Sequence, residues 1–252
     1  GYPALAYRSM LEPFKKSNQV IASNHRPLWQ PEVAPETVTS WEVFAEDIIN
    51  TAENFTSPLT SIGHSMGASA LLIAAARRPE LFQSLILIEP VLVSRTAALI
   101  LRVFGRLFPN KIPLVKKTLA RVDRWPSKQA VFDHFRPKYV FENIGDKELW
   151  DYVNHGVVES ADGSCKLAFS KAWEARCYTI VYDLWPIIAQ VKVPILVVRG
   201  ENSNTLSSSM WQKLKKLSPQ FVCKEIAGAG HLLPFERPET MVSEIQNWLD
   251  NH

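Results

Sequence analysis

A serine flanked by two glycines is the part of this sequence that points most directly to chemistry. Residues 63–67 read Gly-His-Ser-Met-Gly and lie between the strand-like run 59–62 and a helix-like run. A serine on a sharp strand-to-helix turn needs small residues two positions away, because the backbone there is strained. Its hydroxyl then stands exposed, and the N–H groups that open the helix face developing negative charge. The segment predicts Ser65 as a nucleophile; a glycine-rich strand end without chemistry is the alternative interpretation.

A nucleophilic serine needs a base to accept its proton, and His231 is the histidine placed to do so. The flexible run Ala-Gly-Ala-Gly at 227–230 precedes it, after the last strand-like segment. A histidine on such a loop can lie over the carboxyl edge of a parallel sheet, where ligands bind in open α/β folds. His64 is expected to point away from this region, and His134 and His155 are interpreted as surface or satisfied core histidines.

The segments that must position these side chains alternate between strand-like and helix-like patterns. The strand-like runs are short and apolar, at 59–62, 85–88, 193–198 and 221–226. Helix-like patterns cover residues 3–16, 39–55, a stretch with Leu71, Leu72 and Ala75, and a terminal segment from Pro238. A further short strand is expected at 19–22, and Thr39 with Glu42 has the spacing of a capping box. This alternation predicts an α/β fold, with a mostly parallel sheet covered by helices on both faces.

The middle of the chain breaks the alternation. Residues 91–190 show no βαβ pattern, and they hold 14 of the 26 aromatic residues (8 Trp, 6 Tyr and 12 Phe in all). Such an insertion predicts a helical cap, with most of its aromatic side chains in its own core and a few lining a pocket. The expected organisation is a core of residues 1–90 and 191–252 with a cap of residues 91–190.

Composition excludes several other classes of protein. The chain has 252 residues, of which 46% are hydrophobic and 21% charged, as in ordinary globular proteins. Mean hydropathy is -0.06, and no apolar run approaches the roughly 18 residues of a transmembrane helix. The formal charge of +3 mixes 28 basic with 25 acidic residues, so nucleic-acid binding is not expected. Three widely spaced cysteines argue against a disulfide framework or a zinc site, and no signal peptide is recognisable, so a cytoplasmic location is expected.

Positive charge is concentrated in residues 91–130, which hold nine basic side chains and one acid, Asp123. Two interpretations of this segment are open. It is either a solvated helix face or a basic surface that approaches anionic substrates or lipid headgroups. The second interpretation predicts a weak contact with a membrane surface.

With these residues in view, the chain resembles the α/β-hydrolases with a helical cap, specifically the serine hydrolases that include esterases and carbon–carbon bond hydrolases. The resemblance rests on residues 63–67, on the order serine, acid, histidine, and on three further segments. They read Leu-Ile-Glu-Pro at 87–90, Pro-Ile-Leu-Val-Val-Arg-Gly-Glu at 194–201, and Gly-His-Leu-Leu-Pro-Phe-Glu-Arg-Pro at 230–238. It covers nearly the whole chain, the cap only loosely, and implies Ser65 as nucleophile and His231 as general base.

The third member of the expected triad is open between Glu89 and Asn204. Members of the family usually carry an aspartate a few residues after the Arg-Gly-Glu turn, where this chain has Asn204. An amide can orient an imidazole but cannot stabilise an imidazolium by its charge. Glu89 ends the strand after the nucleophile helix, where some relatives carry the acid, and we favour it over Asn204. Glu201 is a third option, although its strand end is expected to turn it outward; a Glu89 that only pairs with the cap is the alternative interpretation.

The resemblance also implies an oxyanion hole formed by the backbone N–H groups of Tyr2 and Met66. Residues 1–3, Gly-Tyr-Pro, are similar to the segment just after the His-Gly oxyanion loop of the family. The first strands of the family's sheet would precede this point, so they are expected to be missing from the chain.

We therefore expect a serine hydrolase that cleaves a small ester, thioester or related acyl substrate through an acyl-enzyme on Ser65. A serine instead of an aspartate at the turn argues against the epoxide-hydrolase and haloalkane-dehalogenase branches. No metal or organic cofactor is expected, and the expected partner is a small acyl substrate. Two alternatives are a degraded hydrolase fold that acts as a binding or scaffold module, and an acyltransferase that uses the same residues.

Overall fold

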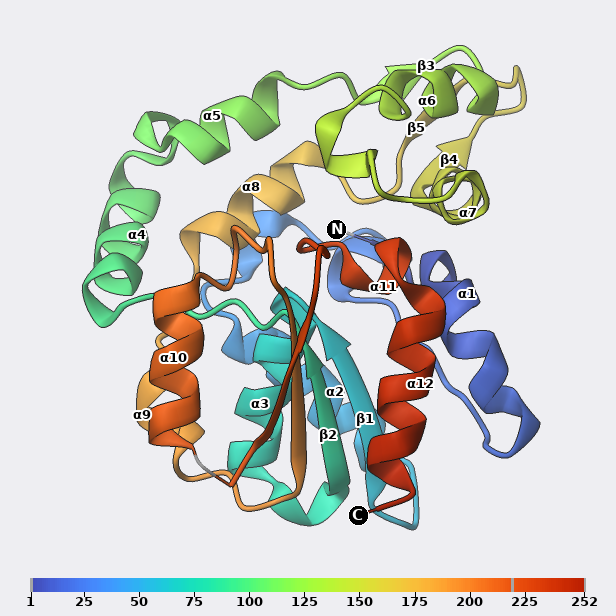
Figure 1. The fold of residues 1–252 in the computed structure, drawn as a ribbon. Helices are drawn as coiled ribbons and strands as arrows, with labels where there is room; N and C mark the ends of the chain where they lie inside the picture. The colour runs from blue at the N-terminus through green and yellow to red at the C-terminus, as the bar shows by residue number, and fades with distance from the viewer. Residues whose placement is uncertain (1, 219, 252) are drawn as a thin grey trace. The chain divides into compact units, whose positions relative to one another are not determined.

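The computed structural model describes residues 2–218 and 220–251, which build a parallel sheet and two sets of helices (Figure 1). Over these residues the principal sheet has the strand order β1-β2-β6-β7. Its strands are β1 (Leu59–His64), β2 (Phe82–Ile88), β6 (Ile195–Gly200) and β7 (Val222–Ile226). All neighbouring pairs are parallel. The four strands predicted from the apolar runs are confirmed.

Strands β2 and β6 form the centre of this sheet and are buried along almost their whole length. In β2 only Gln83 is exposed, and β6 exposes no residue. A nearly continuous apolar sequence is typical of a parallel strand with both faces covered. Helix α3 (Met66–Arg77) packs against β1 and β2, and α2 (Glu42–Ala52) packs against α3. The fold is therefore the α/β class predicted from the sequence.

The chain forms two compact units. One unit, here called the sheet unit, comprises residues 39–100, 181–233 and 243–252 and contains the parallel sheet. The other, here called the helical unit, comprises residues 1–38, 101–180 and 234–242. The core and cap boundaries expected from the sequence stay a prediction.

The helical unit combines short helices with a small antiparallel sheet. Its helices include α1 (Arg8–Leu11), α5 (Pro113–Ala120), α6 (Lys128–Phe135), α7 (Asp146–Gly156) and α8 (Lys171–Thr179). Its strands β3 (Arg124–Trp125), β4 (Val157–Glu159) and β5 (Cys165–Leu167) have the order β3-β5-β4. Strands of two or three residues have no detectable period, which is why the sequence predicted only helices here.

The start of the chain is attached to this unit by polar contacts as well as by packing. Arg8 pairs with the buried Asp151 at 2.7 Å, and the indole N–H of the fully buried Trp173 donates to the carbonyl oxygen of Val33 at 3.0 Å. Buried polar atoms that find partners in this way do not destabilise the fold. The aromatic residues Trp125, Phe135 and Trp173 are buried, as expected for the core of this segment.

The remaining helices belong to the sheet unit or cross from one unit to the other along the chain. They are α4 (Arg95–Leu107), α9 (Trp185–Ile188), α10 (Ser208–Leu217), α11 (Leu233–Glu236) and α12 (Pro238–Leu249). No helix in the described part of the chain is both long and apolar enough to cross a membrane.

Two local expectations are wrong, and a third is correct except for the type of helix. Residues 19–22 have no regular secondary structure, and Ile21 is exposed, because no strand pairs with this segment. The helix expected at 3–16 is present over residues 4–16, but it consists of a 3-10 helix (Ala4–Tyr7), α1 and a second 3-10 helix (Glu12–Lys16); the last contains Pro13, which lacks a backbone N–H to donate. At the start of α2, Ser40 takes the place expected for Thr39: its hydroxyl accepts from the Glu42 N–H at 3.3 Å.

The turn from β1 into α3 holds Ser65 in a strained conformation. Its φ and ψ are 55° and -124°, a region that residues with a Cβ rarely adopt. Gly63 permits the turn to close, because a Cβ there would lie 2.7 Å from the Cα of Ala68. The small residue expected two positions before the serine is therefore required by this close approach.

The strain at Ser65 predicts an unusual order of stability between two variants. Ser65→Gly is expected to exceed Ser65→Ala in free energy of unfolding by about 1 kcal/mol or more, because only glycine adopts this conformation without strain. Exposed Ser243, inside α12, is the control: there the alanine variant is expected to be more stable by up to about 1 kcal/mol. Urea unfolding of the four variants gives both differences, and the same order at both positions would contradict the strained turn.

Candidate active site

Ser65 lies at the carboxyl end of β1, on the first residue before α3. Its backbone N–H donates to the carbonyl oxygen of Ile88 at 2.9 Å, which ties the turn to the end of β2. Its own carbonyl oxygen accepts from the N–H of Ser69 at 3.2 Å, in the first turn of α3. The backbone of Ser65 is thus held from both sides, and its side chain is left to interact across the sheet edge.

His231 reaches Ser65 from the loop that follows β7. Its Nε2 lies 3.0 Å from the Ser65 Oγ. The loop can pass this close to β6 because of Gly200, where a Cβ would lie 2.5 Å from the carbonyl oxygens of Ala229 and Gly230. The glycine-rich sequence before His231 and the glycine that ends β6 therefore act together to place the imidazole.

Glu89 contacts the other nitrogen of the His231 ring. Its Oε2 lies 3.0 Å from Nδ1, and the residue is 0% exposed. The N–H of Gly200 donates to Oε1 at 2.7 Å, and the Ser203 hydroxyl donates to Oε2. Glu89 has a positive φ of 51°, so its backbone is strained like that of Ser65. Donors on several sides are what a buried carboxylate requires to remain ionised.

These contacts determine which ring nitrogen of His231 carries the proton. A carboxylate only accepts hydrogen bonds, so Nδ1 donates to Glu89 when the ring is neutral. Nε2 is then the acceptor that faces the Ser65 hydroxyl. This is the tautomer that a base for Ser65 needs, with Glu89 placed to stabilise the imidazolium that forms.

The other two candidates for the third member of the triad, Asn204 and Glu201, make different contacts. Asn204 is exposed, and its Oδ1 accepts from the hydroxyl of Thr205 at 3.4 Å. The Oε2 of Glu201 accepts from the N–H of Gly228 at 2.9 Å. Of the three candidates considered from the sequence, the structure places Glu89 beside His231.

Ser203 is a residue that sequence reasoning missed. Besides donating to Glu89, its oxygen accepts from the N–H groups of Thr205 at 3.2 Å and Leu206 at 3.1 Å. One serine in a loop has no pattern to detect. The available signal was its place one residue before Asn204, in the loop where the family usually carries its acid.

The loop that contains Ser203 is fastened by a buried side chain of β6. Arg199 is 2% exposed; its guanidinium donates to the carbonyl oxygens of Leu206 at 2.7 Å and Glu201 at 3.1 Å, and it pairs with Glu225. A buried guanidinium needs such partners, since an unpaired charge there would be strongly destabilising. The loop is therefore held at both ends by Arg199 and in its middle by Ser203.

His64 lies against His231, contrary to the expectation that it points away. Its Nε2 is 2.9 Å from the carbonyl oxygen of His231, and the two ring centroids are 5.1 Å apart. Burial lowers the pKa of His64 well below its ordinary value, with a smaller contribution from the charge of His231. A neutral His64 donates through Nε2 to that carbonyl oxygen, so it helps to hold the His231 loop in place.

The two residues expected to form the oxyanion hole belong to different units. Met66 opens α3, where the first N–H groups of a helix have no acceptor within it. Tyr2 belongs to the helical unit, where its ring packs 4.9 Å from that of Phe235 and 5.0 Å from that of Tyr152. Burial raises the pKa of the Tyr2 hydroxyl. The pairing of these two backbone N–H groups stays a prediction.

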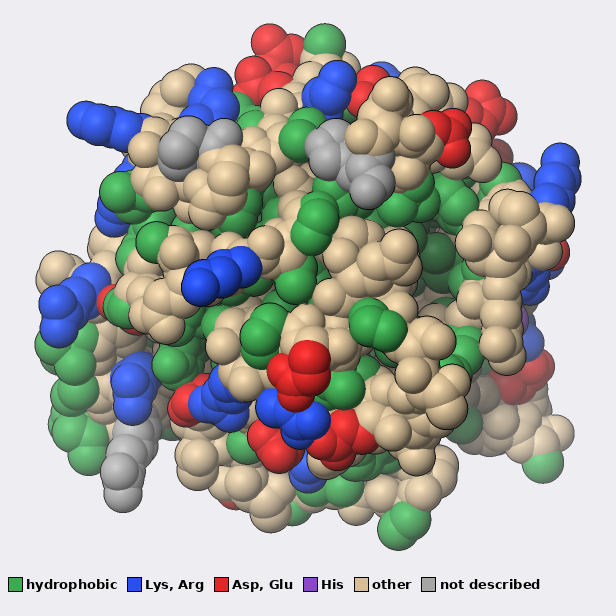
Figure 2. All heavy atoms as spheres, turned by 90° about the horizontal axis from the view of Figure 1, so that it is seen from below, with side chains coloured by type: hydrophobic (Ala, Val, Ile, Leu, Met, Phe, Trp, Pro, Cys, Tyr) green, Lys and Arg blue, Asp and Glu red, His purple; other side chains and the backbone are tan. Residues whose placement is uncertain are grey.

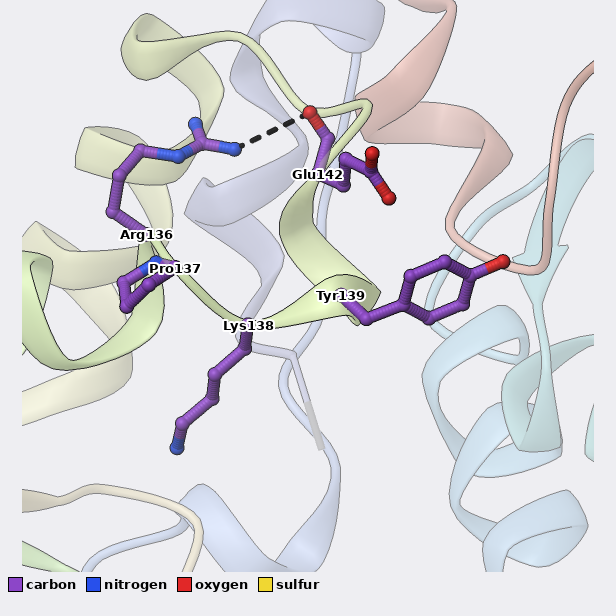
Figure 3. A pocket seen from close by; sticks show the side chains of 5 residues that line it. All are labelled: Arg136, Pro137, Lys138, Tyr139 and Glu142. Atoms are coloured by element: carbon purple, nitrogen blue, oxygen red, sulfur yellow. Dashed lines mark hydrogen bonds between the residues drawn. The ribbon is translucent and has the colours of Figure 1, made fainter.

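The helical unit contains a hollow (Figure 3). It is lined by residues 136–139 and Glu142, and Figure 3 shows Lys138 and Tyr139 pointing away from Arg136. The Arg136 guanidinium donates to the carbonyl oxygen of Glu142 at 3.4 Å and pairs with Asp146 at 3.0 Å. The N–H donors of Arg136 thus bond to groups of the protein itself, and the residues that line the hollow include no nucleophile paired with a base.

The described part of the chain contains no group of three or more His, Cys, Asp or Glu residues that could hold a metal ion.

Comparison with known proteins agrees with this fold. YugF, an uncharacterized hydrolase of Bacillus subtilis, is 23% identical over 249 residues, which cover 98% of this chain and 85% of YugF. The 2-(acetamidomethylene)succinate hydrolase of Mesorhizobium japonicum is 27% identical over 217 residues, covering 86% of this chain and 73% of that protein. A crystal structure of E-2-(acetamidomethylene)succinate hydrolase has a TM-score of 0.79 at 23% identity, covering 99% of this chain and 88% of its own.

The family match extends over most of the sequence. Residues 22–244 match the alpha/beta hydrolase family, a span that includes the parallel sheet, the strained serine turn and the histidine loop. The order of Ser65 and His231 along the chain is also the order of that family. This chain belongs to the alpha/beta hydrolase family.

Proposed function

We propose that the protein is a serine hydrolase that cleaves a small ester, thioester or related acyl substrate. One observation carries the proposal: an unbroken hydrogen-bonded chain runs from the Ser65 hydroxyl through both nitrogens of His231 to the buried Glu89 carboxylate. Membership of the family supports hydrolase activity in general. The serine mechanism and the acyl substrate are inferred from the chemistry of these side chains.

In the proposed reaction, Ser65 Oγ attacks the carbonyl carbon of the acyl group while His231 Nε2 takes the hydroxyl proton. Glu89 stabilises the imidazolium, and the N–H of Met66 faces the oxyanion of the tetrahedral intermediate. The imidazolium then gives its proton to the leaving alcohol or thiol. Water, deprotonated by His231, releases the acid from the acyl-enzyme and restores the serine.

The alternatives differ from this proposal in what happens at Ser65. A binding or scaffold module with a degraded site would not need an ionised carboxylate buried against His231, so the contacts of Glu89 count against it. An acyltransferase would use the same acyl-enzyme with another acceptor in place of water. Adding an alcohol acceptor and identifying the product separates acyl transfer from hydrolysis.

The proposed compartment is the reducing cytoplasm. Three free thiols, two of them buried, support this proposal.

A fluorophosphonate is expected to add once to the parent chain and not to Ser65→Ala. Phosphonylation requires a serine whose proton can be taken by a neighbouring base, which His231 provides for Ser65. The intact mass of each protein after treatment is the measurement. Ser209→Ala is the matched control, because Ser209 is an exposed serine in α10 and its loss should leave the adduct unchanged. A folded parent without an adduct, or an adduct that persists in Ser65→Ala, would refute the proposal.

Glu89→Gln is expected to lower kcat for an activated ester by about 10³–10⁴-fold, because an amide removes the charge that stabilises the imidazolium. Asn204→Ala is expected to leave kcat unchanged, since its side chain contacts Thr205. The kcat of Ser203→Ala should lie between those of the other two variants. We expect it to fall on the order of tenfold, because one donor to Glu89 is removed. Steady-state kinetics of the three variants gives the order. A larger loss for Asn204→Ala than for Glu89→Gln would assign the supporting role to the amide.

A further inference from the structure

An exposed apolar face runs along the second half of α4 and the residues that follow it. Val103, Phe104 and Leu107 are 47%, 51% and 62% exposed, and successive turns of the helix place them on one side. Within the same helix, Leu99 and Ile100 are 61% and 51% exposed. Helices of globular proteins usually turn their apolar side inward, so a face like this one indicates a partner.

The apolar surface continues through α5. The exposed large hydrophobic side chains are Leu114 and Leu119 within α5, Phe108 before it and Val122 after it. The inward side of the segment is instead made of small or buried residues. A Cβ on Gly105 would lie 2.6 Å from the Cβ of Thr179, and Val115 and Thr118 are buried. We call the exposed side chains of residues 101–122 the α4–α5 surface.

This surface also carries exposed basic side chains; Arg121, which is half-buried and pairs with Glu174, is not one of them. Residues 101–122 contain six basic residues and no acidic one. Arg102, Lys111, Lys116 and Lys117 are exposed, and in the part of the chain that the structure describes none of them has a carboxylate within ion-pair distance. The nearest acid in sequence, Asp123, pairs with Lys171 at 3.3 Å.

On another part of the protein, opposite charges lie together. Near the lower middle of the face drawn in Figure 2, basic and acidic side chains are next to one another. Arg77 pairs with Glu42, and Arg78 pairs with both Glu53 and Glu80.

Exposed lysines without an ion pair occur elsewhere in the described residues, for example Lys16 and Lys147. The α4–α5 surface differs because four such cations belong to one segment that also has an exposed apolar face and no acid. We expect a partner to supply their counter-charge.

We propose that the α4–α5 surface binds the surface of an anionic phospholipid bilayer. Apolar side chains on one helical face with basic residues beside them are the signature of segments that lie in the lipid interface. Phe104 and Leu107 would enter the boundary between headgroups and acyl chains, while Lys116 and Lys117 contact lipid phosphates. A protein partner fits less well, because the centres of protein interfaces are depleted of charge. The proposal does not depend on the chemistry at Ser65.

Sedimentation with phospholipid vesicles tests the surface. The protein is mixed with vesicles of phosphatidylcholine alone, or with about one-third phosphatidylglycerol to give a negative surface potential. The parent is expected to partition to the anionic vesicles on the order of tenfold more strongly, and added salt should weaken the binding. The paired variants Phe104→Gln/Leu107→Gln and Lys116→Gln/Lys117→Gln should each lower the partition coefficient by on the order of tenfold.

Matched controls distinguish binding by this surface from nonspecific adsorption to vesicles. Tyr139→Gln/Val140→Gln removes two exposed apolar side chains of the same unit, and Lys16→Gln/Lys147→Gln removes two exposed lysines. Both control pairs should bind vesicles like the parent, and far-ultraviolet circular dichroism should show all variants folded. Failure of the parent to bind anionic vesicles, or equal losses in the control pairs, would overturn the proposal. The molar mass of each variant is measured by light scattering. A dimer that is present in the parent and lost only in Phe104→Gln/Leu107→Gln would overturn the proposal, because the surface would then bind a second copy of the chain.

Discussion

A fully buried carboxylate is the constraint around which the carboxyl edge of the sheet is arranged. Glu89 is 0% exposed, and an ionised carboxylate without donors would be very unfavourable there. Gly200 at the end of β6, Ser203 in the next loop and His231 after β7 supply those donors. All three segments must keep their positions for Glu89 to stay satisfied. Through His231, the position of Ser65 depends on the same network.

Backbone strain is found at the same edge as this network. Among the described residues, the non-glycine residues with positive φ are Ser65 and Glu89, which directly follow the neighbouring strands β1 and β2. Conformations of this kind cost roughly 1–3 kcal/mol each and persist only where the surroundings enforce them. Here the enforcement comes from the sheet: the Ser65 N–H bonds to Ile88, and the Glu89 N–H bonds to Val198 at 2.8 Å. The buried apolar strands thus hold two polar side chains in positions that neither would adopt alone.

Local patterns in the sequence were sufficient for the parts of this structure that local physics determines. Short apolar runs predicted the four parallel strands, and glycine spacing singled out Ser65 and the loop of His231. The choice among acids needed distances between residues more than 100 positions apart, which no local pattern contains. Ser203 and the three short antiparallel strands were missed because segments of one to three residues carry no period. The expected strand at 19–22 failed because an apolar run forms a strand only where another strand can pair with it.

The contact between Ser203 and Glu89 limits how the acid of this fold can change place. An aspartate at 203 would put two carboxylates in contact at a buried position, and like charges so close cannot both ionise. A carboxylate at the end of β2 and a carboxylate at position 203 therefore cannot both be ionised in this chain. A lineage that moved the acid from one position to the other would have to change both residues together, so the two positions are expected to be epistatic.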